Sequence, residues 1–274
     1  MAWDRIRKPP RRTSDPRSLP TDSRPQSQYT CTVASIREAK IAYDNLSCKA
    51  RKTVDKTLGK GGMIYWVNWP DEIKSDTIYP ESHVGHYQDF PAGMSFEDIA
   101  DALVHYPEKD GNLFRALDSL ENVLREKVKN RESVDPHTLR FFIHLNGDLY
   151  CPMHMAHVDD KGGNAVKMKW FGSNTNLHSV WDGKMIDSQG YSYSEYAEIL
   201  EQYYDSLKKP LMKDEWSEAE LVWQTYQLTS EIYKYQPSWD GNTYHYIYRW
   251  HEPMEKQLYI AGIRLARVLN SIYK

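Results

Sequence analysis

FFIHLNGDLYCPMHMAHVDDKGGN (residues 141–164) and TNLHSVWDGKMID (residues 175–187) are the most informative stretches of this sequence of 274 residues. Together they carry five potential metal ligands: His144, Asp148, His154, His178 and Asp182. Imidazole and carboxylate groups are the ligands that Zn²⁺ takes where thiolates are absent. The sequence therefore predicts a zinc centre in this part of the chain.

The spacing of these residues supports the prediction. His144 and Asp148 are four residues apart, and so are His178 and Asp182. On a helix this separation places two side chains on the same face, about one turn apart. A lone histidine with an aspartate four residues later is more often an ordinary core or surface residue. Two such pairs with a histidine between them favour metal binding. Each pair could bind one ion.

Pro152 lies between the first pair and His154. Proline removes a backbone donor and restricts the residue before it, so a helix rarely continues through this position. We expect a helix to begin at Asp135-Pro136, because proline is favoured in the first turn, and to bend or end before His154. The bend lets His154 turn toward the second pair.

The surrounding pattern is mostly helical. Apolar residues recur at helical spacing, and Ser95 with Asp98 forms a capping box at one helix start. A short hairpin or strand pair is expected in residues 159–172. The expected helices cover residues 33–58, 95–104, 113–130, 193–207, 215–235 and 253–273. The fold class is mainly α, with a small β-hairpin, and one domain over residues 29–274 is the expectation.

Composition restricts the possible partners. The net charge of −3 gives no basic surface overall, so a nucleic acid would be bound by a local site. Nine tryptophans and twenty tyrosines are more than a core needs, and some of these rings suit stacking against bases. No apolar run is long enough to span a membrane. The three cysteines have no C-x-x-C spacing and do not predict a zinc site of thiolates.

Residues 1–28 have a different composition from the rest. They are rich in Arg, Pro, Ser and Asp and poor in core-forming residues, which predicts a disordered tail. This segment lacks the uninterrupted apolar stretch of a signal peptide.

The motifs also have a distinctive order: WPDEIK (69–74), GHYQD (85–89), HLNGD (144–148), CPMH (151–154), GGN (162–164) and NLHSVWD (176–182). This order resembles the zinc-dependent single-strand nuclease and 3′-nucleotidase family, the nuclease S1/P1 family, whose relatives include zinc phospholipase C. The resemblance runs from about Val33 to Tyr273 and is most specific between Phe141 and Asp182. It implies a helical phospholipase C or zinc nuclease-like fold with a cluster of three zinc ions in a cleft.

The resemblance also implies roles for individual residues. One ion would be bound by Asp71, His86, His144 and Asp148, and a second by His154, His178 and Asp182, with Asp148 reaching a third. Lys74 matches a residue that touches the substrate phosphate, and Asn176 would support the ligand histidine beside it. Asp89 corresponds to an acid that orients water, which makes Lys74, Asp89 and Asp148 the candidate catalytic residues.

The implied activity is metal-assisted hydrolysis of phosphodiester bonds in single-stranded DNA and RNA, giving 5′-phosphorylated products, with possible 3′-nucleotidase activity. The substrate would be single-stranded nucleic acid or nucleotides, and the protein a secreted or periplasmic monomer without membrane contact. The family holds its third ion with an amino-terminal Trp and a nearby His, and this sequence offers no match. Two zinc sites are therefore expected.

Two alternatives to an active nuclease remain open from the sequence. The first is a degenerate, catalytically weak protein of the same fold that binds two zinc ions, and the missing amino-terminal ligands favour it. The second is a phosphodiesterase resembling phospholipase C, which ranks lower because GGN and NLHSVWD match the nucleases.

Overall fold

The computed structural model describes residues 32–74, 85–107 and 111–274, so the predicted tail lies outside the described residues. Within these ranges the protein is mainly α-helical with a two-stranded antiparallel sheet, as predicted. The helices of the first half are α1 (Thr32–Asp44), α2 (Cys48–Leu58), α3 (Gly62–Trp66), α4 (Trp69–Glu72), α5 (Phe96–His105), α6 (Leu113–Lys129) and α7 (Pro136–Asp148). Those of the second half are α8 (Leu177–Ser179), α9 (Met185–Asp187), α10 (Tyr193–Tyr203), α11 (Asp205–Met212), α12 (Glu218–Tyr235) and α13 (Thr243–Ile272). The strands are β1 (Lys167–Trp170) and β2 (Ser173–Asn176), and short helical turns are η3 (Pro152–His154), η4 (Val158–Asp160), η5 (Val180–Lys184) and η6 (Gln236–Ser238).

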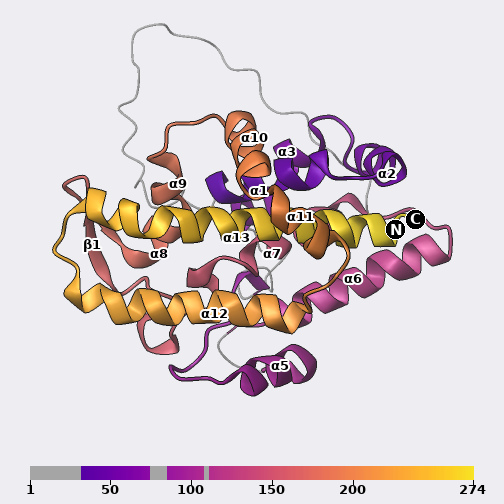
Figure 1. Ribbon diagram of the computed structural model, residues 1–274. Coiled ribbons are helices and arrows are strands. Elements are labelled where there is room, and N and C mark those ends of the chain that lie inside the picture. Colours follow the sequence, from indigo (N-terminus) through magenta and orange to yellow (C-terminus); the bar gives the residue numbers. More distant parts are fainter. Residues whose placement is uncertain (1–31, 75–84, 108–110) are drawn as a thin grey trace, which may run out of the picture.

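The long helix α13 crosses the molecule and organises the core (Figure 1). Helices α1, α7 and α11 pack against it, and α10 joins α1 on the same side. Helix α12 runs across the same face of the molecule as α13 and packs on α5 (Figure 1). Because α1, α2, α4, α6 and α13 all contact α7, the helix with the first ligand pair lies at the centre of the fold.

The ends of α7 follow the signals in its sequence. Asp135 caps the start of the helix, because its side chain accepts a hydrogen bond from the Thr138 amide at 3.3 Å. Pro136 occupies the first position, where no backbone donor is needed. The helix ends at Asp148, and Pro152 then opens the 3-10 turn η3. The predicted start and end of this helix are confirmed.

The first predicted helix is divided in two. The expectation of one pattern over residues 33–58 is wrong at residues 45–47, where α1 ends and α2 begins. Ser47 caps α2 by accepting a hydrogen bond from the Ala50 amide at 3.2 Å. Its own amide donates to Asn270 Oδ1 at 2.7 Å, so a contact with α13 fixes the break.

The last helix begins ten residues before its predicted start, at Thr243 rather than Pro253. Asn242 caps it by accepting hydrogen bonds from the Tyr244 and His245 amides. Tyr246 and Trp250 precede Pro253 at helical spacing, and both are buried. The buried face of the helix therefore extends to both sides of the proline. The predicted helix over residues 193–207 also divides, at Tyr204, into α10 and α11.

The predicted hairpin exists but lies further along the chain. Strand β1 pairs with β2 from Lys167 opposite Asn176 to Trp170 opposite Ser173. Phe171 and Gly172, with φ of 47° and 81°, make the tight turn between them. The expectation of strands from residue 159 onward is wrong, because Gly162 and Gly163 adopt positive φ and turn the chain before β1.

Candidate metal centre

The first ligand pair lies on the last turn of α7 and faces the interior. His144 is fully buried, Asp148 is nearly so, and His144 Nε2 lies 3.4 Å from Asp148 Oδ2. The carbonyl oxygen of Val67, just after α3, accepts a hydrogen bond from His144 Nδ1 at 2.8 Å. Because a carbonyl only accepts, Nδ1 carries the proton in this bond, and Nε2 is left to face the other ligands.

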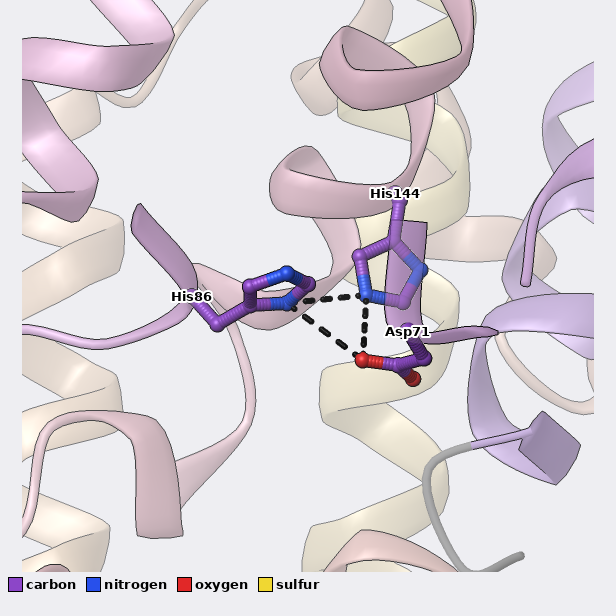
Figure 2. A group of neighbouring side chains, drawn as sticks. All are labelled: Asp71, His86 and His144. Atoms are coloured by element: carbon purple, nitrogen blue, oxygen red, sulfur yellow. Dashed lines mark hydrogen bonds and ion pairs between the residues drawn. The ribbon is translucent and has the colours of Figure 1, made fainter. Parts of the chain in front are cut away.

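Asp71 from α4 and His86 from the segment before α5 meet His144 at its Nε2 atom (Figure 2). His86 Nδ1 is 3.1 Å from His144 Nε2, and Asp71 Oδ1 is 3.5 Å from each of these nitrogens. Ligand atoms around a tetrahedral zinc ion with bonds of about 2.0–2.1 Å lie about 3.3 Å apart. Three ligand atoms therefore converge at the separation that a zinc ion requires, and this donor set fits zinc.

Asp148 lies between this first group (Asp71, His86 and His144) and the remaining predicted ligands. Its Oδ2 atom is 2.9 Å from His86 Nδ1, and its Oδ1 atom is 3.1 Å from His154 Nδ1. Each oxygen of the carboxylate thus faces a different histidine. Asp148 is the residue that connects the two halves of the centre.

The second group contains His154, His178 and Asp182. His154 Nε2 is 3.4 Å from Asp182 Oδ1, and His178 Nε2 is 3.7 Å from Asp182 Oδ2. The carbonyl of Gly162 accepts a hydrogen bond from His178 Nδ1 at 2.8 Å, which leaves Nε2 toward the centre. Asp182 lies on η5, which is a π-helical turn, a local geometry often found at functional sites.

The chain therefore brings together all seven residues that the sequence indicated: Asp71, His86, His144, Asp148, His154, His178 and Asp182. Pro152 does let His154 turn toward the second pair, as predicted. Backbone hydrogen bonds secure this turn, since the Gln88 amide donates to the His154 carbonyl at 2.9 Å and so joins the His86 segment to it.

The charges of the centre are strongly coupled. Burial lowers the pKa of His144, but the carboxylates of Asp148 and Asp71 outweigh it and raise the pKa to about 9. Burial lowers the pKa of His86 to about 4, against the opposing hydrogen bond to Asp148. Burial also raises the pKa of Asp148, but His144 and His154 hold it well below its usual range. Ionised carboxylates in a buried site attract cations.

Comparison with known proteins agrees with this geometry. The family model for S1/P1 nuclease matches residues 37–274. The chain belongs to the S1/P1 nuclease family. It is 26% identical to Endonuclease 5 of Arabidopsis thaliana over 88% of each chain. It is 30% identical to Endonuclease 3 of Arabidopsis thaliana over 75% of each chain, and 31% identical to Nuclease S1 of Aspergillus oryzae over 74% of each.

The match to the family model confirms two predictions made from the motif order, the family and the nuclease hydrolase class. The mainly α fold class is confirmed as well. In residues 32–74, 85–107 and 111–274, no helix combines the length and the apolar character needed to cross a membrane.

Three further predicted residues of this S1/P1-family chain surround the centre. Lys74 Nζ lies 2.6 Å from Asp71 Oδ1, and about a third of its side chain is exposed. Asn176 caps α8 by accepting a hydrogen bond from the Ser179 amide at 2.7 Å, which positions His178. Asp89 lines a cavity of about 410 Å³ that also has His178 in its wall.

Two residues at the centre were missed by the sequence analysis. Cys151 lies with His154 and Asp182 in a group whose ligand atoms are all within 4.8 Å of one another. Its spacing to His154, with two residues between them, was the available signal. Glu38 on α1 is 6% exposed and its carboxylate packs against Gly147. An acid followed at helical spacing by the apolar residues Ile41 and Ala42 was the signal there.

Proposed function

We propose that this chain is a zinc-dependent endonuclease that hydrolyses phosphodiester bonds of single-stranded DNA and RNA to 5′-phosphorylated products. The observation that carries the proposal is the convergence of two ligand groups on the two oxygens of Asp148. Such paired sites suit an in-line displacement at a phosphate. We also infer 3′-nucleotidase activity, a monomeric state and a secreted or periplasmic location, which rest on the family alone.

The seven ligands would be divided between two zinc ions. Asp71, His86, His144 and Asp148 would hold one ion, and His154, His178 and Asp182 a second. Bound zinc supplies a water of lowered pKa and neutralises charge on the attacking and leaving oxygens. The carbonyls of Val67 and Gly162 keep His144 and His178 in the ligand orientation, so little rearrangement accompanies substrate binding.

Lys74 would bind the phosphate. Its ammonium group neighbours Asp71 at the edge of the first group, and about a third of its side chain is exposed to solvent. A substrate held there presents its reacting phosphate to the metal centre. Lys74 would thus orient the phosphodiester and offset part of its negative charge.

The cavity beside the second group suits a nucleobase. Tyr87 and Val158 give it an aromatic and an apolar wall, while Asp89 and Asn164 supply polar groups that can bond a base edge. A base inside a duplex is stacked and cannot enter such a space. The cavity therefore supports a preference for single strands with little dependence on sequence.

The decisive experiment measures metal content and nuclease activity in the same preparation. The zinc-loaded chain should degrade single-stranded DNA and RNA faster than the matching duplex, leave 5′-phosphates detectable by mass spectrometry, and lose activity with a chelator. Elemental analysis should show less zinc in His144→Ala and in His178→Ala. His105→Ala is the matched control, because His105 lies exposed at the end of α5 and should leave zinc and activity unchanged.

The degenerate two-zinc protein remains the second candidate. The two ligand groups that meet at Asp148 would hold zinc whether or not the chain hydrolyses a substrate. Full zinc loading without hydrolysis of any single-stranded substrate would favour this candidate over the active enzyme. Unchanged zinc in both histidine variants would refute the metal assignment itself.

A further inference from the structure

Cys151 opens the CPMH motif (151–154), but the metal ligands that the family resemblance implies do not include it. It precedes the 3-10 turn η3 and caps it, and the His154 amide donates a hydrogen bond to the Cys151 carbonyl at 3.0 Å. The thiol of Cys151 and the imidazole of His154 lie in the same region, because their ligand atoms are within 4.8 Å of each other.

That region is the second ligand group. Asp182 reaches it from η5, and the sulfur of Cys151, a nitrogen of His154 and an oxygen of Asp182 lie within 4.8 Å of one another. Ligand atoms of a tetrahedral zinc ion with a thiolate at about 2.3 Å lie about 3.3–3.6 Å apart. A shift of about 1 Å, within the range of a side-chain adjustment, brings the sulfur to bonding distance. Cys151 is a free thiol, so no disulfide competes for the sulfur.

We propose that Cys151 is a thiolate ligand of the second metal ion, joining His154 and Asp182. The inference rests on the proposed zinc centre and adds a sulfur donor to it. On binding, the S–H bond breaks, its proton passes to solvent, and the sulfur electron pair forms the bond to the metal, with no oxidation. Cys151 would add one sulfur donor to the nitrogen and oxygen donors already proposed for this ion.

A sulfur donor changes which metals the centre accepts. Thiolate is a soft ligand, so the second site should favour zinc, cobalt and cadmium over magnesium, calcium and manganese. The second ion would also hold Cys151, His154 and Asp182 in fixed positions relative to one another.

Cobalt(II) is the probe for the test, because a thiolate bound to cobalt gives a charge-transfer band in the near ultraviolet that nitrogen and oxygen ligands do not give. The full-length chain is stripped of metal and titrated with cobalt(II), with bound cobalt counted by elemental analysis. We expect the band in the wild type and its loss in Cys151→Ser. The double variant Cys31→Ser/Cys48→Ser is the matched control, because it leaves Cys151 as the one thiol and should keep the band.

Two further outcomes separate this inference from the proposed function. Cobalt bound without the band would overturn ligation by Cys151 and leave the metal centre standing. No bound cobalt at all would overturn both. Since Cys151→Ser could disturb folding, X-ray absorption of the zinc-loaded wild type supplies a second measurement: it should contain a sulfur neighbour at about 2.3 Å. Absence of this sulfur would refute the inference.

Discussion

Replacing Glu38 by Gln tests whether the acid behind the metal centre opposes folding at neutral pH. The Glu38 carboxylate packs so closely on Gly147 that a Cβ added there would lie 1.9 Å from Oε2. Burial, followed by repulsion from Asp148, raises the pKa of Glu38 from 4.5 to about 8. Gln has nearly the same shape but carries no ionisable group, so Glu38→Gln should remove this effect and little else.

The magnitude follows from proton binding in the two states. Between pH 4.5 and about 8 the folded chain keeps the Glu38 proton that the unfolded chain has released. The free energy of unfolding therefore falls as the pH rises through this range. One pKa unit corresponds to about 1.4 kcal/mol, so the whole difference sets a limit of about 5 kcal/mol. Glu38→Gln should exceed the stability of the wild type by about 1 kcal/mol or less at pH 5 and by about 2–5 kcal/mol at pH 8.

Urea unfolding followed by circular dichroism, repeated from pH 5 to 9 with chelator present, measures this difference. The surface variant Glu231→Gln on α12 is the control, because Glu231 is exposed and the change should be within about 0.5 kcal/mol at every pH. If the stability difference between Glu38→Gln and the wild type does not change with pH, the reasoning about Glu38 is refuted.

The other predictions concern the centre, the cavity and the core. Asp148→Asn should release metal from both groups and lower activity about a thousandfold, because metal ions supply several kcal/mol of transition-state stabilisation; full metal content by elemental analysis would contradict this. Tyr87→Ala should raise KM for a single-stranded oligonucleotide about tenfold or more and change kcat less, since a stacked base contributes about 1–3 kcal/mol; an unchanged KM would argue against stacking. Leu124→Ala, in the buried face of α6, should lower the free energy of unfolding by about 2–5 kcal/mol in urea titrations. Val123→Ala on the exposed face should change it by about 0.5 kcal/mol or less, and equal losses would contradict this assignment of faces.

Local sequence patterns were sufficient to predict the part of the metal centre that lies on α7 and η3. The spacing of His144 and Asp148 predicted a shared helical face, and Pro152 predicted the turn that carries His154. Asp71 and His86 are different, because they lie far from α7 in the chain and no local pattern brings them together. The family resemblance indicated them, and tertiary packing places them there.

The errors in the fold have the same physical origin. The break before α2 depends on Asn270 in the last helix, and apolar periodicity does not register such a distant contact. The early start of α13 depends on Asn242 as a cap, and Pro253 concealed it because proline usually ends or begins a helix. The role inferred for Cys151 needs the 3-10 geometry of η3, which spacing alone does not specify.

The two carbonyls that orient the histidines have an evolutionary consequence. The hydrogen bonds to His144 and His178 are accepted by the backbone carbonyls of residues 67 and 162. A substitution replaces the side chain and keeps the carbonyl, so most substitutions at these two positions should leave the orientation of the histidines unchanged. The remaining constraint is conformational. Val67 has ordinary helical angles, whereas Gly162 has a φ of 65° and packs against Asp89. Position 67 should therefore drift freely among apolar residues in relatives, while position 162 should remain glycine.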